Sequence, residues 1–197
     1  MPEQELGSGV NEARDPYELM KAYTRSGKRI TTADRTLDLL LDGVTVVTTV
    51  YQGRFYGLSV AWVTRVSGAN HLVLAVVAHN SHTHRFIKQS GVFAMNVLGE
   101  DQTDVARHFG RQTGTDVDKF KRQDHYWETR QTGAPILLDA LGYLDCGVVA
   151  AYDPPGGDHT LFVGDVLDAS ILRPGHPLIY RRQDYPYRVD ESLIRDE

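Results

Sequence analysis

Stretches rich in β-branched and apolar residues follow one another from residue 44 onward, and they predict strands. Residues 44–51 (VTVVTTVY) consist mostly of valine and threonine, and the Gln52-Gly53 pair after them is typical of a tight turn. Residues 71–78 (HLVLAVVA) are apolar almost throughout, which indicates a strand covered on both faces. Two further apolar stretches, joined by the turn PPGG, predict a long hairpin over residues 140–170.

Helical patterns are few. Residues 15–18 (DPYE) combine a capping residue, a proline at the first helical position and a capping-box glutamate, and they predict a short helix. Further helices are expected over residues 33–42, 82–90 and 101–109, and a glycine follows the first two of these directly. The charged residues 111–130 predict a solvated loop with a short helix around Lys119-Phe120. Strands thus dominate without regular strand–helix alternation, which favours an antiparallel barrel over a Rossmann sheet.

Composition and charge exclude several classes of protein. The chain has 197 residues, 41% of them hydrophobic, which suits one globular domain. With a net charge of −5 and no blocks of like charge, the chain lacks the basic patch that is typical of proteins that bind nucleic acid. The longest apolar run, residues 72–78, is too short to span a bilayer, and the polar N-terminal segment does not resemble a signal peptide. The single cysteine, Cys146, fits a reducing compartment. We therefore expect a cytoplasmic protein that binds neither nucleic acid nor membrane.

A polar turn at residues 80–83 (NSHT) stands between an apolar strand and a predicted helix. Ser81 is a good N-cap residue, and a helix start offers unpaired backbone N–H groups with partial positive charge. Such a corner suits a phosphate group. His159 follows the PPGG turn at the mouth of a strand. The two features together suggest a site for a nucleotide-like cofactor.

These residues also have purely structural explanations. Ser81 and Thr83 suit helix capping, which is the better explanation on the local sequence alone. His159 next to Asp158 suits the anchoring of a hairpin turn. Trp62, at the end of an apolar strand, fits the core about as well as the wall of a cofactor site.

Three nearby histidines, His79, His82 and His84, invite a metal interpretation because imidazole is a common metal ligand. Their spacing matches no compact zinc signature, and no cysteine or carboxylate pair stands beside them. Positions 82 and 84 also fall on different faces of a helix. We therefore expect no metal site, and we expect His82 or Arg85 to attract a phosphate group instead.

The order of these motifs resembles the FMN-binding split-barrel flavoproteins, specifically the flavin reductase-like branch. The resemblance covers about residues 40–187 and rests on GVTVVTT, GLSVAWVTRVS, NSHTHRFIKQSGVFAMNVL, ARHFG, GDHTLFVGDV and PLIYRRQDYPY. It implies a mainly β fold, an antiparallel split β-barrel of the Greek-key type with peripheral helices. The expected organisation is an N-terminal extension with a short helix at 1–35, the flavin reductase-like domain at 36–190 and a tail at 191–197.

The resemblance also implies a function. Members of this family form homodimers that bind FMN or FAD between the subunits. Many reduce flavin with NADH or NADPH and pass it to a partner oxygenase. We therefore expect an NAD(P)H-dependent flavin reductase. Two alternatives stay open: a flavoredoxin-like electron carrier that keeps FMN and has no direct NAD(P)H activity, and a non-catalytic module that binds another ligand.

The resemblance further assigns roles to individual residues. His159 falls on the histidine that members place near the reacting face of the flavin and the nicotinamide, and the tail residues Tyr185 and Tyr187 would cover the site. Tyr56 and Trp62 depart from common family residues, although a flavoredoxin-like branch carries tryptophan at the second position. Ala69 and Asn70 replace a usual Pro-Pro. The expected flavin-binding residues are Gly57, Ser59, Val60, Ala61, Trp62, Asn80, Ser81, Thr83 and Phe109.

Overall fold

The computed structural model describes residues 32–37, 39–111, 118–121 and 126–180. The chain divides into two compact units, one made of Met1–Leu40 with Arg182–Glu197 and the other of Leu41–Arg181. In the first unit the structure describes helix α1 (Thr32–Leu37). The helix expected at residues 15–18 and the tail residues Tyr185 and Tyr187 lie outside the described residues.

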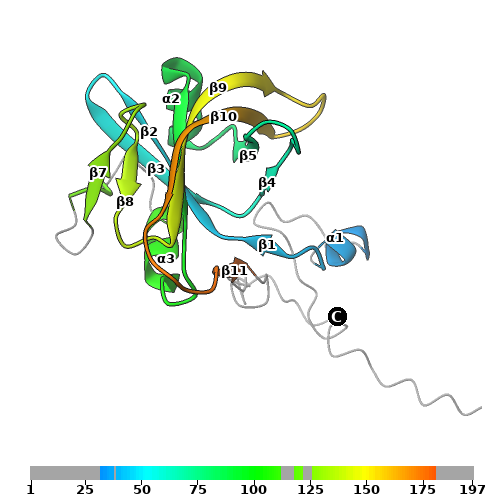
Figure 1. The fold of residues 1–197 in the computed structure, drawn as a ribbon. Helices are drawn as coiled ribbons and strands as arrows, with labels where there is room; N and C mark the ends of the chain where they lie inside the picture. The colour runs from blue at the N-terminus through cyan, green and yellow to red at the C-terminus, as the bar shows by residue number, and fades with distance from the viewer. Residues whose placement is uncertain (1–31, 38, 112–117, 122–125, 181–197) are drawn as a thin grey trace, which may run out of the picture. The chain divides into compact units, whose positions relative to one another are not determined.

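The second unit is built mainly from antiparallel strands (Figure 1). Seven strands form one sheet in the order β3-β2-β6-β9-β10-β5-β4, and two small sheets pair β1 with β11 and β7 with β8. The strands are β1 (Asp42–Gly43), β2 (Thr45–Tyr51), β3 (Arg54–Val60), β4 (Val63–Arg65), β5 (Leu72–Ala78), β6 (Val92–Val97), β7 (Trp127–Thr129), β8 (Pro135–Leu137), β9 (Gly142–Tyr152), β10 (His159–Ile171) and β11 (Ile179–Tyr180).

The two edge strands of the large sheet are consecutive in the chain. Only Ala61 and Trp62 separate the end of β3 from the start of β4. Because successive Cα atoms are about 3.8 Å apart, so short a link requires the two edges to approach each other and the sheet to curl. The expected mainly β fold, an antiparallel split barrel with peripheral helices, is confirmed.

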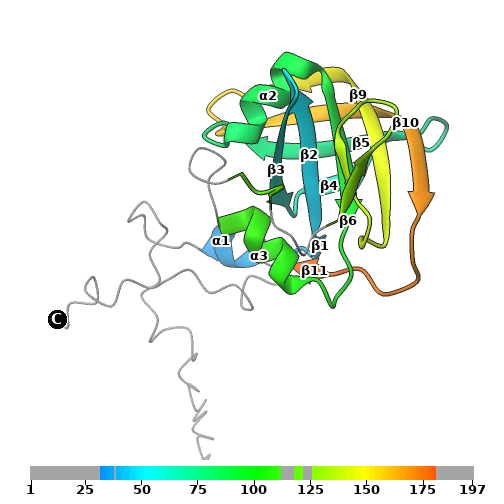
Figure 2. The same cartoon turned by 90° about the vertical axis from the view of Figure 1, so that its left-hand side faces the viewer.

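Two helices pack at opposite ends of this barrel, α2 (His82–Ser90) and α3 (Thr103–Arg111) (Figure 2). Helix α2 has the predicted bounds. Ser81 caps its start, and Gly91 ends it with a left-handed φ of 69° while its N–H donates to the carbonyl of Ile87. In the described part of the chain, no helix is long and apolar enough to cross a membrane.

Two sequence expectations require correction. The helix expected over residues 33–42 ends at Leu37, because Asp42–Gly43 forms β1 and pairs with β11. Long-range strand pairing overrides the local helical preference there. Strand β5 is covered unequally: Val73, Ala75 and Val77 are buried, while the alternate residues are only half-buried. This alternation places one face of β5 against the barrel interior.

The barrel interior contains large side chains from β6, β9 and β10. Phe93, Phe162 and Cys146 are fully buried there, together with residues of β2 and β5. Burial raises the pKa of the Cys146 thiol to about 12, with Asp145 and Asp165 adding to the effect. The Cys146 thiol is therefore buried and unreactive.

Candidate functional site

Strand pairing brings the two sequence-distant parts of the expected site together at one end of the barrel. His159, at the start of β10, lies opposite Ala78, at the end of β5. The backbone N–H of His79 donates to the carbonyl of Asp158 at 2.9 Å. On the other side of β5, Val76 donates to the carbonyl of Trp62 at 2.9 Å. Trp62 just before β4, the turn just after β5 and His159 at the start of β10 therefore lie at the same end of three adjacent strands.

The turn before α2 has the geometry of an anion-binding helix start. The Ser81 hydroxyl accepts a hydrogen bond from the backbone N–H of His84 at 3.2 Å. No acidic side chain lies in the first turn of α2. Asn80 and Arg85 are exposed and Ser81 is half-buried, whereas the Thr83 side chain is buried. Backbone N–H groups, the Ser81 hydroxyl and the Arg85 cation can hold a phosphate group here.

His159 is held by its neighbour in the sequence. Its Nδ1 lies 2.6 Å from Oδ1 of Asp158, and this hydrogen bond is the main reason that the pKa of Asp158 is lowered. Within the described residues, Nε2 of His159 has no hydrogen-bond partner. The carboxylate thus fixes one nitrogen of the ring and leaves the other for a ligand.

Trp62 lies beside this histidine, with the two ring centroids 4.8 Å apart. The indole is 53% exposed, so the alternative that placed Trp62 in the core is wrong. Since an exposed indole beside a histidine presents a flat aromatic face, it suits stacking against a planar ligand.

The other residues that were expected to contact the flavin, in and near β3, pack against neighbouring residues of the protein itself. Ser59 donates its hydroxyl to the carbonyl of Ala106 in α3 at 2.7 Å, and Val60 is buried in the core. A Cβ on Gly57 would stand 3.0 Å from the ring of Phe109, which is itself 1% exposed. These contacts fix the backbone of β3. Ala61 and Trp62 directly follow this strand, and they are half-buried and exposed respectively.

Tyr56, one of the departures from the family pattern, packs on helix α2. Its ring stacks on Phe86 with centroids 3.8 Å apart and approaches His82 at 5.6 Å. The tyrosine thus packs β3 against helix α2, close to the start of that helix.

Lys119 is buried, although the charged residues 111–130 predict a solvated segment. Its ammonium group donates to the carbonyls of Gly57 at 2.9 Å and Phe109 at 2.8 Å, and burial lowers its pKa to about 8. The neighbouring Phe120 is buried against Phe109 and Gly57. The one sequence signal was this phenylalanine inside a charged segment.

Lys119 should make stability depend on pH. Its pKa lies near 8 in the folded chain and near 10.5 when unfolded, so the unfolded chain binds more protons between these values. The penalty for burying the charge is full below about pH 8 and is relieved as the pH rises toward 10.5. Urea unfolding should therefore show wild-type stability increasing over this window relative to Lys119→Met. Parallel pH curves for the two proteins would contradict the assignment.

Comparison with known proteins adds to this geometry. Residues 37–187 match the family described as flavin reductase like domain. The reductase component of 4-nitrophenol 4-monooxygenase/4-nitrocatechol 2-monooxygenase from Rhodococcus opacus is 37% identical over 150 residues, covering 74% of this chain and 76% of that protein. An NADH-dependent flavin reductase from a Rhodococcus species is 33% identical over 167 residues, covering 83% and 88%.

Solved structures show the same architecture. The crystal structure of a nitrilotriacetate monooxygenase component B homologue from Mycobacterium thermoresistibile superposes with a TM-score of 0.67 at 33% identity. The match covers 75% of this chain and 80% of that one.

Proposed function

Because the chain belongs to the flavin reductase like domain family, we propose that it is an NAD(P)H:flavin oxidoreductase. The resemblance that the order of motifs indicated is confirmed. The protein uses a reduced nicotinamide to reduce FMN or FAD, and NADH is the donor in the name of the Rhodococcus relative. The observation that carries the proposal is the placement of Trp62, the Ser81 turn and His159 at the same end of the adjacent strands β4, β5 and β10.

The described residues fit a flavin. The start of α2 and the Ser81 hydroxyl would hold its phosphate, aided by Arg85, and the exposed face of Trp62 would lie against its ring system. When bound, the flavin supplies the redox chemistry, because its ring accepts the hydride of the nicotinamide. The backbone of residues 59–62, shaped by the packing of Gly57 and the bond from Ser59 to α3, would line the same region.

His159 is proposed to position the reacting groups. The Asp158 carboxylate accepts a hydrogen bond from Nδ1, so Nε2 of the neutral ring can accept one from an N–H group of the nicotinamide. The protonated ring could instead donate from Nε2 to the charge that develops on the reduced flavin. Hydride transfer itself moves no proton, so His159 does not have to act as a general acid or base.

We also propose that the chain forms a two-fold homodimer. Symmetric dimers are the commonest assembly of soluble proteins, and a flavin held at the split of one small barrel stays poorly covered. Light scattering at micromolar concentration with flavin present should give twice the 22.0 kDa of the chain. A monomer under these conditions would contradict the dimer. Exposed apolar side chains available to a second copy lie on the β9–β10 hairpin: Val149, Tyr152, Leu167 and Ile171.

The proposed physiological role is to supply reduced flavin to a partner oxygenase, because the Rhodococcus opacus relative is named as the reductase component of a monooxygenase. The proposed location is the cytoplasm, where nicotinamide is abundant and the buried thiol of Cys146 stays reduced.

Mixing the purified chain with NADH and then NADPH, each with FMN or FAD, tests the proposed reaction. Nicotinamide oxidation should require added or bound flavin. A flavoredoxin-like carrier is the second candidate, favoured by the exposed Trp62 as a surface for a resident FMN. A yellow protein that neither NADH nor NADPH reduces would select the carrier over the reductase.

A further inference from the structure

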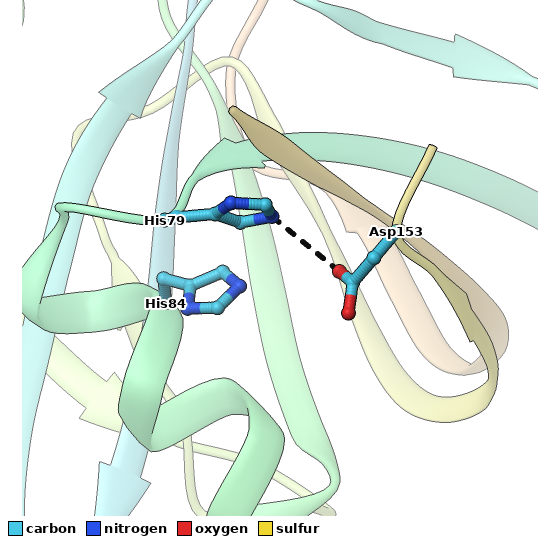
Figure 3. A group of neighbouring side chains, drawn as sticks. All are labelled: His79, His84 and Asp153. Carbon is cyan, nitrogen blue, oxygen red and sulfur yellow. Dashed lines mark ion pairs between the residues drawn. The ribbon is translucent and has the colours of Figure 1, made fainter. Parts of the chain in front are cut away.

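Three potential metal ligands meet next to the turn before α2, on elements that are distant in the sequence. His79 follows β5, His84 lies in the first turn of α2, and Asp153 follows β9. Their ligand atoms all lie within 4.8 Å of one another, and Figure 3 shows both imidazole rings extending toward the carboxylate. It is the only group of this kind among the described residues.

The spacing of His79 and Asp153 suits two ligands of one ion better than a direct hydrogen bond. Nε2 of His79 lies 3.4 Å from Oδ1 of Asp153, whereas N–H···O hydrogen bonds are about 2.7–3.2 Å long. Two ligands of a tetrahedral ion with bonds of about 2.0–2.1 Å stand roughly 3.3–3.4 Å apart. The observed separation therefore leaves room for an ion between them.

Neighbouring side chains orient these ligands. Lys88 donates to Oδ2 of Asp153 at 2.9 Å, which leaves Oδ1 facing His79. The hydroxyl of Thr160 contacts both Oδ1 of Asp153 and Nε2 of His84, the latter at 2.7 Å. The hydroxyl thus occupies the same two atoms that an ion would bind, so the ion must displace it from both of them. Lys88 holds the other oxygen of the carboxylate, and partners on the non-ligating atom commonly set the orientation of metal-binding side chains.

We propose that His79, His84 and Asp153 bind one divalent transition-metal ion of the Zn²⁺ class. Two imidazoles and one carboxylate favour such an ion over Mg²⁺ or Ca²⁺, which prefer oxygen ligands. The bound ion ties the turn that contains Ser81 to the tip of the β9–β10 hairpin, next to His159. The local histidine spacing hid this site, because the fold supplies the carboxylate from a distant hairpin and His82 takes no part.

The test is a calorimetric titration of Zn²⁺ into the full-length chain in phosphate-free buffer. One ion per chain should bind. His79→Ala and Asp153→Asn should each weaken the affinity at least about tenfold. Loss of a residue that only orients a ligand already costs about 10–100-fold, and loss of a ligand should cost no less. His71→Ala, which removes an exposed histidine away from the cluster, is the matched control and should bind as the wild type does.

Wild-type affinity no tighter than that of the His79 and Asp153 variants, or an equal loss in the His71 control, would overturn the proposal. Both altered side chains are well exposed, so the variants should fold. A second readout needs no variant: Co²⁺ bound at this site should show the strong visible absorption of a four-coordinate ion. The weak spectrum of hydrated Co²⁺ would overturn the proposal as well. Neither readout depends on flavin reduction.

Discussion

Replacing Phe162 with alanine is expected to lower the free energy of unfolding by about 3–5 kcal/mol, the usual cost of truncating a buried phenylalanine. The ring is fully buried in the barrel interior, on the strand that begins with His159. It packs against the ring of His84, with centroids 5.5 Å apart. The substitution therefore removes apolar burial, leaves a cavity, and removes a contact of His84 in the first turn of α2.

Urea unfolding followed by circular dichroism measures this effect. Tyr126→Ala is the matched control, because it truncates an aromatic side chain that is largely exposed. The control should change stability by less than about 0.5 kcal/mol. A loss below about 1 kcal/mol for Phe162→Ala would show that the barrel interior is not packed as described.

Ser81→Ala and His159→Ala are expected to impair different steps. Ser81→Ala removes a hydroxyl from the phosphate end of the proposed flavin site. Losing a hydrogen bond to a charged group costs about 1.5–3 kcal/mol. Flavin affinity should therefore fall by about one to two powers of ten in a fluorescence-quenching titration.

His159→Ala should leave flavin affinity near that of the wild type, because the histidine is proposed to face the reacting end of the flavin and not its phosphate. The kcat/KM of this variant for the nicotinamide should fall by about 10–100-fold, which is the effect expected from losing one or two hydrogen bonds in the transition state. The measurement is steady-state NADH oxidation at saturating flavin.

Two controls separate these roles from general damage. Gly91→Ala strains the other end of the same helix, where φ is 69°, without touching the phosphate turn. It should weaken folding but not flavin binding, whereas Ser81→Thr should recover most of the affinity. If Ser81→Ala left flavin binding unchanged and His159→Ala left turnover unchanged, both role assignments would be wrong.

The parts of this molecule that the sequence predicts well have local causes. Helix α2 could be bounded from Ser81 and Gly91 alone, because capping and the left-handed glycine are signals within a few residues. The position of His159 at the start of a strand could be predicted from the turn directly before it. Hydrophobic patterning and the lack of strand–helix alternation were enough for an antiparallel barrel.

Features that depend on long-range packing escaped prediction. Lys119 looked solvated because its partners, the carbonyls of Gly57 and Phe109, reach it only through the tertiary fold. Asp153 joins His79 and His84 only because β9 and β10 turn back beside β5. Neither arrangement leaves a spacing in the sequence that could reveal it.

The central claim is that this chain transfers reducing equivalents from a nicotinamide to flavin. Anaerobic rapid mixing of the chain with FMN or FAD and then NADH or NADPH tests it most directly, with the visible absorption of oxidised flavin as the signal. The flavin should bleach at a rate that increases with protein concentration and exceeds the rate without protein. Flavin that keeps its colour with either nicotinamide, while the protein binds it, would contradict the claim.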